Sequence, residues 1–401
     1  MHDFSASTQF LFDKFRSGRM RFAKGELQHP EEIWSFQTRS FPAKGPESSP
    51  VFDSRGNIFF GCHDGCFYSL SPSGSLRWMF KTAAKIYSSP LLISEERVCV
   101  ASGDGYLHCF STEGSRIWSY DLCSEFRSLH LGKKLFSSFM HLHKTVDVPR
   151  RRFTMTRCWS SPALDHQGNV LISGFGIGLH AVNSTTGTRT WAYDLGWPRY
   201  HLSGVATNQL GEIFVGSQES WLHGLTPSGT LKWKMKVPRG FQTWGNPSVD
   251  PESDTVFFPL GNGEKKGLIV ATDFAGNIKW KTQIGAAIRG SVTRLAAERV
   301  VVGTLNGVLL QIHTKDGTVR RQAALTNARR GLWTSASIDR TGNIFVTTKD
   351  CEKSGSVCCL TDKFEMLWRY RLGKSLSVPV LDANARLFVG SWDGSFKCLQ
   401  T

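Results

Sequence analysis

The sequence repeats a short β-rich unit along most of its length, and this repetition limits the possible folds more than any other feature. Each copy contains runs of β-branched and aromatic residues separated by Gly-Asn, Asp-Gly or Ser-Gly pairs, and most copies end in a segment with a tryptophan. Asp-Gly and Asn-Gly pairs favour tight hairpins, because both central residues of such turns need a positive φ. Each copy therefore predicts a four-stranded antiparallel meander. The copies begin at Ser48, Ser88, Ser160, Ser203, Gly245, Gly290, Thr334 and Ser377.

The two ends of the chain predict how the copies assemble. The last copy stops at SFKCLQT without a Trp-bearing fourth strand, whereas residues 31–38, EEIWSFQT, have the pattern of that strand but precede the first copy. Pairing of the two ends would close eight blades into a ring without a free sheet edge. We therefore predict an all-β fold, an eight-bladed β-propeller of four-stranded antiparallel blades closed by the N-terminal strand. Residues 31–401 form this single domain, and residues 1–30 form an N-terminal extension.

The SSP starts, the GN and DG turns and the terminal Trp resemble the pyrroloquinoline-quinone-like (PQQ-like) repeat of quinoprotein alcohol dehydrogenases and of the outer-membrane assembly lipoprotein. The resemblance implies a propeller, a fold that hosts many unrelated activities. In quinoprotein dehydrogenases it also implies quinone and calcium, which need acidic and amide ligands at the channel mouth. This chain offers Glu47 and Asn246 there. The resemblance also implies a disulfide between neighbouring cysteines over the cofactor, as in some quinoprotein dehydrogenases. Cys358 and Cys359, however, lie inside an expected strand, where neighbouring side chains face opposite sides of the sheet. We therefore favour neither cofactor and expect no metal.

Comparison of the eight copies separates residues that belong to the blade from residues particular to one copy. A large aromatic side chain that recurs at one position of the copies indicates docking between blades. We assign Arg320 to this position in the one copy without a tryptophan there. Three histidines share a position in the third strand with Tyr68, and we expect them to be packing residues. The recurring tryptophans are Trp34, Trp78, Trp118, Trp191, Trp233, Trp280 and Trp368, and the histidines are His108, His180 and His223.

The residue just before each copy does not recur, and this position predicts the functional site. In a propeller the first strand of each blade lines the central channel, and the loop that leads into it lies on the face where ligands usually bind. Large rings at a wet channel mouth cost solubility unless they bind something or fill the channel themselves. We predict an aromatic funnel with a cationic rim and a single carboxylate. In chain order the position holds Glu47, Tyr87, Trp159, Leu202, Trp244, Arg289, Trp333 and Leu376.

The residues of this funnel predict acid/base chemistry on a small anionic molecule. Glu47 is the candidate general base, His201 the candidate acid or proton shuttle, and Tyr87 a competitor for these roles. Aromatic and cationic neighbours would hold a flat molecule with negative charge by stacking and ion pairing. The candidate substrate-binding residues are Trp159, Trp244, Trp333, Arg157, Arg289, Lys85, Asn246 and Tyr200.

Residues 123–157 form an insertion between the second and third copies and concentrate positive charge. The chain has 48 Lys and Arg against 33 Asp and Glu, a net charge of +15, and the insertion holds eight of the cations and two of the acids. Its apolar residues recur at roughly helical spacing, which predicts one or two amphipathic helices. We rank a lid over the channel mouth first, docking of an acidic protein or carrier domain second, and nucleic-acid binding a distant third.

The remaining composition limits the function classes further. No stretch is long and apolar enough for a secretory signal or a membrane span, which predicts a soluble, cytoplasmic monomer. The ten cysteines form no paired C-x-x-C array, so the sequence does not indicate a zinc site. We favour a cofactor-independent enzyme of the lyase, cyclase, isomerase or hydrolase kind, acting on an aromatic or conjugated anionic metabolite. The alternative is a non-catalytic scaffold for an acidic protein partner, and the minor alternative is a quinone-dependent dehydrogenase.

Overall fold

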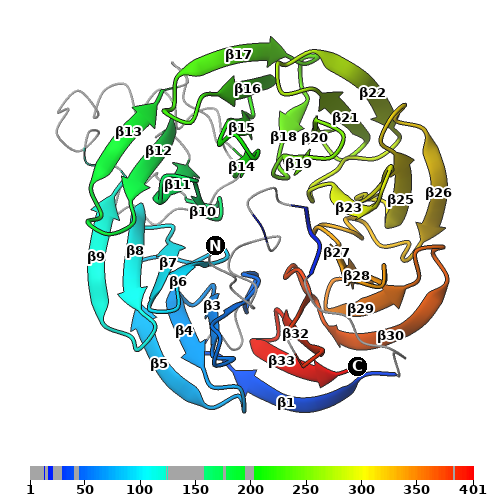
Figure 1. Cartoon of the computed structure of the whole chain (residues 1–401). Helices are drawn as coiled ribbons and strands as arrows, with labels where there is room; N and C mark the ends of the chain where they lie inside the picture. The colour runs from blue at the N-terminus through cyan, green and yellow to red at the C-terminus, as the bar shows by residue number, and fades with distance from the viewer. Residues whose placement is uncertain are drawn as a thin grey trace, which may run out of the picture.

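A computed structural model of the chain shows eight antiparallel sheets arranged around a central channel (Figure 1). It describes residue 13, residues 17–20, 29–39, 45–122 and 124, residues 158–174, 178–194 and 203–382, and residues 384–401. In blades 1 to 7 the chain runs from the innermost strand outwards, and among the described residues only blade 5 carries a fifth strand. The expected eight-bladed propeller of four-stranded antiparallel blades is confirmed. The helices expected in 123–157 lie outside the described residues, apart from residue 124.

The first four blades follow one another along the chain. Blade 1 contains β2 (Val51–Phe52), β3 (Ile58–Gly61), β4 (Cys66–Leu70) and β5 (Leu76–Lys81). Blade 2 contains β6 (Leu91–Ser94), β7 (Arg97–Ala101), β8 (Tyr106–Ser111) and β9 (Arg116–Asp121). Blade 3 contains β10 (Ala163–Leu164), β11 (Asn169–Gly174), β12 (Gly178–Asn183) and β13 (Arg189–Tyr193). Blade 4 contains β14 (Ala206–Thr207), β15 (Ile213–Gly216), β16 (Trp221–Leu225) and β17 (Leu231–Lys236).

The other four blades complete the ring. Blade 5 contains β18 (Gln242–Thr243), β19 (Ser248–Asp250), β20 (Thr255–Asn262), β21 (Lys266–Thr272) and β22 (Ile278–Ile284). Blade 6 contains β23 (Thr293–Ala296), β24 (Arg299–Gly303), β25 (Val308–His313) and β26 (Val319–Ala324). Blade 7 contains β27 (Ser337–Ile338), β28 (Ile344–Lys349), β29 (Ser354–Leu360) and β30 (Met366–Gly373). Blade 8 contains β31 (Val380–Leu381), β32 (Arg386–Gly390), β33 (Ser395–Gln400) and, from the N-terminal part of the chain, β1 (Glu31–Gln37).

Blade 8 closes the ring as the sequence predicted. β1 pairs antiparallel with β33 along its whole length, from Glu31 opposite Gln400 to Gln37 opposite Ser395. Trp34 packs against Phe388 and Phe396 of the same blade, with ring centroids 5.9 Å and 6.3 Å apart. The pairing covers the edge that β33 would otherwise expose.

The recurring tryptophans dock each blade onto the next. Except for Trp368, the ring of each of these tryptophans lies against a glycine in the last turn of the following blade, for example Trp78 against Gly114 and Trp233 against Gly276. These glycines have a positive φ, and a Cβ atom at either position would come within 3.0 Å of the indole. Five of the indole N–H groups also donate to a carbonyl of that turn, those of Trp34, Trp78, Trp118, Trp233 and Trp280.

The seam between blades 6 and 7 departs from this rule and corrects the sequence assignment. The strand register places Arg321, not Arg320, opposite Gln311 and therefore in the tryptophan position. In the facing turn of blade 7 the glycine is replaced by Phe364, which has a φ of 70° and packs partly buried against the apolar cluster of this seam. Gln311 donates its side-chain N–H to the carbonyl of Asp362 at 3.1 Å, the bond that an indole makes elsewhere. Three substitutions together thus rebuild one seam without a tryptophan.

The second residue of each SSP-like start links the blades around the channel. Its backbone N–H donates to the side chain at the same position in the next blade, as in Ser49 to Ser89 at 2.9 Å and Ser89 to Ser161 at 2.9 Å. Bonds of this kind also join Asn246 to Ser291 and Ser291 to Ser335. The recurring serine is therefore a structural residue, because it satisfies a buried amide at each junction that it joins.

A short piece of the N-terminal extension adds to the inner wall of the ring. Arg19 forms a parallel bridge with Ile338 of β27, and the carbonyl of Ser17 accepts the N–H of Arg294 of β23. Met20 is buried in the cluster between blades 7, 8 and 1. The sequence analysis did not anticipate these contacts. Among the described residues, no helix is long and apolar enough to cross a membrane.

Candidate functional site

Side chains from seven blades, and Gly204 from blade 4, surround one cavity of about 200 Å³ at the mouth of the central channel. The loops that enter the innermost strands supply Glu47, Tyr87, Trp159, Trp244, Arg289, Trp333 and Leu376, and the starts of those strands supply the serines and glycines between them. The funnel predicted by comparing the copies is therefore a real convergence of these side chains, although the chain separates Glu47 and Trp333 by almost 300 residues.

The other predicted site residues have different positions. Lys85 is exposed and is not among the residues that line the cavity. Arg157, Tyr200 and His201 lie outside the described residues. Asn246 does line the cavity, but its Oδ1 atom accepts the backbone N–H of Gly204 at 2.7 Å. Asn246 thus takes the place of a serine in the ring of bonds between blades.

Glu47 faces a buried histidine. The Nε2 atom of His63 lies 3.1 Å from Oε2 of Glu47, without the alignment of a hydrogen bond. The His63 side chain is 3% exposed and that of Glu47 17%. The imidazole also meets Tyr87 edge-on at 4.6 Å between ring centroids and lies 6.3 Å from the ring of Trp392. A carboxylate and a buried imidazole thus lie side by side at the edge of the mouth.

His63 and Trp392 were missed by the sequence analysis. Both stand in the turn between the second and third strands of their blades, in the segments GCHDG and GSWDG, where blade 2 has Gly103. The same comparison of copies, extended to this turn, would have singled them out as departures. Lys374 lies over the Trp392 ring with its Nζ atom 3.8 Å from the centroid, so this turn adds a cation to the same side of the molecule.

Arg289 is the cation that enters the cavity from blade 6. Its guanidinium carbon lies 4.0 Å from the ring centroid of Trp244 and 5.6 Å from that of Trp333, which are cation–π distances. Nη2 donates to the carbonyl of Gly263 at 3.2 Å, but Nε and Nη1 are buried without a hydrogen-bond partner. Burial, with a smaller effect of Arg330, lowers the pKa of Arg289 to about 10, so the group stays charged at neutral pH.

The second cation of the rim is already engaged. Arg330 lies 5.2 Å from the Trp333 ring and pairs with Glu264, which also pairs with Arg329 at 2.7 Å. Glu264 makes no ion pair with Arg289 and acts on it only through its charge, which slightly favours the protonated guanidinium. Unpaired donors of a buried guanidinium cost free energy unless a ligand or water satisfies them. The arrangement therefore points Arg289 towards an anion that enters the cavity.

The mouth does not fit the quinone and calcium of quinoprotein dehydrogenases. Of the described residues that line the cavity, Glu47 is the single acidic one, and it faces His63, while the amide oxygen of Asn246 bonds to backbone. The described residues contain no group of three or more His, Cys, Asp or Glu that could hold a metal. Cys358 and Cys359 are buried in two different apolar clusters on opposite faces of β29 and are not joined to each other. We derive no step through quinone or calcium.

The histidines of the third-strand position are structural, as the sequence predicted. Nδ1 of His180 is 2.8 Å from the hydroxyl of Tyr120, and Nδ1 of His223 is 3.1 Å from that of Tyr193, both across a seam between blades. Nδ1 of His108 bonds to Ser119 within its own blade at 2.8 Å. Burial lowers the pKa of His223 to about 4, with a smaller contribution from Lys234, so this imidazole is neutral in the folded protein.

The repeats, the closed ring and the mouth define an eight-bladed propeller of PQQ-like repeats. A family model described as outer membrane protein assembly factor BamB matches residues 28–135 and 176–363, more than half of the sequence. The chain therefore belongs to this family.

Solved structures share the architecture. BamB from Moraxella catarrhalis superposes with a TM-score of 0.66 at 14% identity, covering 93% of this chain and 98% of the other. The computationally designed Ika8 protein gives a TM-score of 0.66 at 10% identity, covering 92% and 100%. Quinohemoprotein alcohol dehydrogenase from Comamonas testosteroni gives 0.51 at 12% identity, covering 98% and 80%. At these identities the likeness concerns the fold alone.

One curated protein is similar at a higher level over a short stretch. The mouse (Mus musculus) beta-alanine-activating enzyme is 40% identical over 83 residues, which is 20% of this chain and 7% of the mouse protein. The matched region is thus a small fraction of a much longer protein.

Proposed function

We propose that the channel mouth binds a small anionic molecule and performs acid/base chemistry on it without a cofactor. The observation that carries the proposal is Arg289, whose Nε and Nη1 atoms are buried without partners while the ring of Trp244 fixes its guanidinium plane. Two parallel hydrogen bonds to a carboxylate use Nη2 together with Nε or with Nη1, so each unpaired atom can act beside the second hydrogen of Nη2, whose first hydrogen goes to Gly263. The ligand class is therefore a small, flat carboxylate of the aromatic or conjugated kind.

The size of the site supports a small ligand. A cavity of about 200 Å³ lies below the range of roughly 300–1,000 Å³ that is typical for drug-sized molecules. Trp159, Trp244 and Trp333 give it apolar walls, which exclude water and strengthen an ion pair with Arg289. A single aromatic ring with one carboxylate has a suitable shape for this space.

The acid/base step is assigned to Glu47 with His63. The Glu47 carboxylate accepts a proton from the substrate and, as the carboxylic acid, returns it to the product; Nε2 of His63, 3.1 Å away, can take the proton from Glu47 and give it back between these two steps. Tyr87, edge-on to His63, fixes the imidazole ring. Reactions of the lyase, cyclase or isomerase kind need no more than such a proton transfer beside an anchored anion.

The mouse relative adds one specific ligand to the candidates. Its name concerns β-alanine, a small zwitterion that could place its carboxylate on Arg289 and its ammonium on Glu47. Because the similarity covers 7% of the mouse protein, β-alanine is a candidate to be tested beside aromatic acids.

The proposal is tested by thermal unfolding with benzoate, indole-3-acetate and β-alanine. Binding to the folded state raises the melting temperature by mass action, and saturation at about 100 times Kd adds about 2.7 kcal/mol of stability. We expect one of the three to stabilise the wild type by a few degrees and to have no effect on Arg289→Gln. The matched control is Arg55→Gln, because Arg55 is exposed and pairs with Glu113 away from the mouth. Equal shifts in both variants, or no shift with any probe, would contradict the proposal.

Catalysis by Glu47 can be tested separately from ligand binding by Arg289. With a ligand that is turned over, Glu47→Gln should lower kcat by about 10²-fold or more and leave the Arg289-dependent thermal shift in place. Binding without turnover of any probe, with a normal thermal shift, would favour the alternative of a non-catalytic binding module.

A further inference from the structure

Positive charge is concentrated on the outer strands of one half of the ring. The outer strands of blades 4 to 7 (β17, β22, β26 and β30) carry nine Lys and Arg and no Asp or Glu, and all nine are exposed. The outer strands of the other four blades (β1, β5, β9 and β13) carry four cations and three acids. We call the first set the basic rim: Lys232, Lys234, Lys236, Lys279, Lys281, Arg320, Arg321, Arg369 and Arg371.

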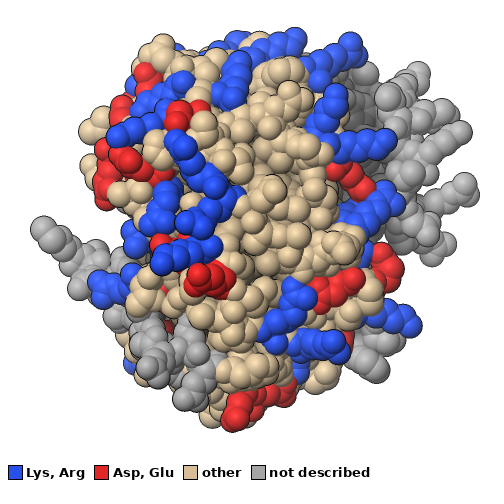
Figure 2. All heavy atoms as spheres, turned by 90° about the vertical axis from the view of Figure 1, so that its right-hand side faces the viewer, with Lys and Arg blue, Asp and Glu red and all other residues tan. Residues whose placement is uncertain are grey.

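More than half of the basic rim is not neutralised. Lys232 pairs with Glu212 and Arg320 with Asp316, while Lys279 and Arg369 donate to carbonyls. The other five residues make no ion pair with the described residues, and two of them, Lys234 and Lys236, lie over the ring of Trp221 at 5.2 Å and 5.6 Å. The unpaired residues are Lys234, Lys236, Lys281, Arg321 and Arg371. Figure 2 shows Lys and Arg spread over the side of the molecule that contains β26, with fewer Asp and Glu between them.

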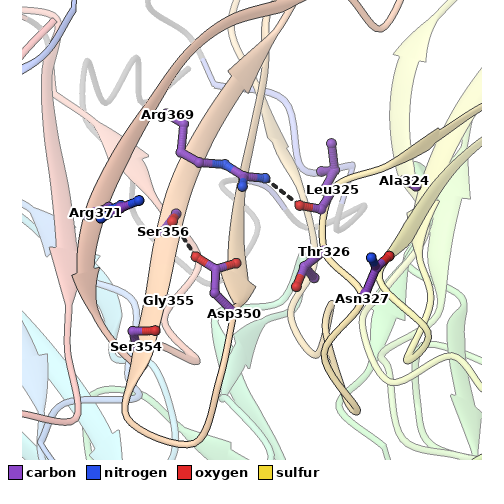
Figure 3. A pocket seen from close by; sticks show the side chains of 10 residues that line it. All are labelled: Ala324, Leu325, Thr326, Asn327, Asp350, Ser354, Gly355, Ser356, Arg369 and Arg371. Carbon is purple, nitrogen blue, oxygen red and sulfur yellow. Dashed lines mark hydrogen bonds between the residues drawn. The ribbon is translucent and has the colours of Figure 1, made fainter.

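The basic rim also contains the larger of the two cavities described here, about 640 Å³. This cleft opens at the seam between blades 6 and 7, between the end of β26 and strands β29 and β30 (Figure 3). Arg369 reaches across it to the carbonyl of Leu325, and Asp350 accepts hydrogen bonds from Ser356 and Thr348. Arg371 also lines the cleft and makes no ion pair with Asp350 or with any other described residue.

The shape of the surface decides between anionic partners. The four strands follow the outside of the ring from the top of Figure 1 around its right-hand side to the lower right, so the rim is convex. A flat lipid surface would reach one or two blades at a time, and a stiff duplex has the same limitation. An extended polypeptide can follow the curve at about 3.3 Å per residue and insert one side chain into a cleft.

We infer that the basic rim is a docking surface for an extended acidic polypeptide segment, which places a carboxylate side chain in the cleft beside Arg371. This surface lies on the outer wall of the ring, away from the channel mouth, and the inference does not depend on the mouth being an active site. Charge complementarity of this kind sets partner choice and association rate.

The test is fluorescence anisotropy with a labelled peptide of about twelve Glu and Ser residues at low salt, long enough to span about 40 Å. The test variant is Lys234→Glu/Lys281→Glu/Arg371→Glu, which reverses one unpaired cation in each of blades 4, 5 and 7. The matched control, Arg55→Glu/Arg116→Glu/Arg189→Glu, makes the same change in net charge with exposed residues of blades 1 to 3. We expect the peptide to bind the wild type, to bind the test variant at least about tenfold more weakly, and to bind the control within about twofold of wild type.

A second pair of probes separates the partner classes. A single-stranded oligodeoxynucleotide of equal charge and vesicles containing anionic phospholipid are titrated against the same three proteins. The inference is supported if the oligodeoxynucleotide and the vesicles both bind the wild type more weakly than the peptide does. Equal weakening of the peptide by both triple variants would show a general charge effect and overturn it. Tighter binding of the oligonucleotide or the vesicles through the blade 4 to 7 residues, or no binding of the peptide to the wild type, would also overturn it.

Discussion

Arg289 and Glu47 occupy the same position in two blades where the others place aromatic residues or leucine. Comparison of the copies was sufficient to predict both as site residues, because a residue required by the blade structure would recur at this position in every copy. It could not predict that Glu47 faces His63, since that pairing depends on how a turn of blade 1 folds over the channel. Nor could it predict that the amide oxygen of Asn246 accepts the backbone N–H of Gly204, because only the register of neighbouring blades brings the two residues together.

The buried histidine of blade 4 gives a prediction about pH. The folded protein holds His223 neutral with a pKa of about 4, whereas an unfolded chain protonates it near its ordinary value of about 6.5. Between these values the unfolded state binds more protons, so the stability present above pH 6.5 is lost as the pH falls towards 4. We expect the free energy of unfolding to drop by about 2 kcal/mol more in the wild type than in His223→Gln between pH 7.5 and pH 5.

Urea unfolding at the two pH values measures this difference. Other titrating groups contribute equally to the two proteins and cancel in the comparison. Parallel curves for wild type and His223→Gln would show that His223 is not held neutral by burial.

At the scale of elements, the strand order and the role of the recurring Trp were predictable, because hairpin turns and regular large rings have few alternative explanations. The seam between blades 6 and 7 was not. Arg321, Gln311 and Phe364 replace a Trp, a small residue and a Gly, and their joint effect is visible only once β26 and the last turn of blade 7 face one another. The assignment of Arg320 was also one residue too early, because Trp78 and Trp118 follow their turn glycines by four residues and the same spacing from Gly317 gives Arg321.

This seam predicts a cost for Gln311→Ala. The change removes the hydrogen bond to the carbonyl of Asp362 and leaves a void at a residue that is 2% exposed. We expect a loss of about 1–3 kcal/mol in the free energy of unfolding. The neighbouring and exposed Gln322→Ala is the control and should lose less than about 0.5 kcal/mol. Equal effects of the two would mean that Gln311 does not replace the indole bond.

The ring of serines predicts a second cost at the scale of elements. Ser89→Ala removes the hydroxyl that accepts the N–H of Ser49 and leaves this buried amide without a partner. We expect a loss of about 1–3 kcal/mol by chemical denaturation, and a smaller loss for Ser89→Thr, which keeps the hydroxyl. Indistinguishable stabilities of the Ala and Thr variants would argue against the hydroxyl as the stabilising group.

For the whole molecule, the two chain ends predicted the closure of the ring, because the strand missing from the last copy was present before the first. The contacts of residues 17–20 with β23 and β27 could not be predicted, since a short extended segment has no periodicity that marks its partner. The function of the ring is also not a property of the fold, which proteins of different names share.

Closure gives a prediction about the first strand. Trp34 of β1 docks blade 8 onto blade 1 as Trp78 docks blade 1 onto blade 2, each ring lying against a glycine of the next blade. Trp34→Ala should therefore lower stability about as much as Trp78→Ala, by about 3 kcal/mol or more. Thermal unfolding of the two variants checks the comparison. A stable, cooperative Trp34→Ala protein beside a strongly destabilised Trp78→Ala protein would mean that β1 does not hold the ring closed.

The central claim is that the channel mouth anchors a small carboxylate on Arg289, and a crystal soaked with 4-bromobenzoate tests it most directly. The anomalous signal of bromine locates the ring without reference to any assumed pose. We predict bromine in the cavity walled by Trp159, Trp244 and Trp333, with the carboxylate within hydrogen-bond distance of Nε or Nη1 of Arg289. Bromine found at the basic rim alone, or an Arg289 that keeps its unpaired donors at a saturating concentration of the acid, would contradict the account.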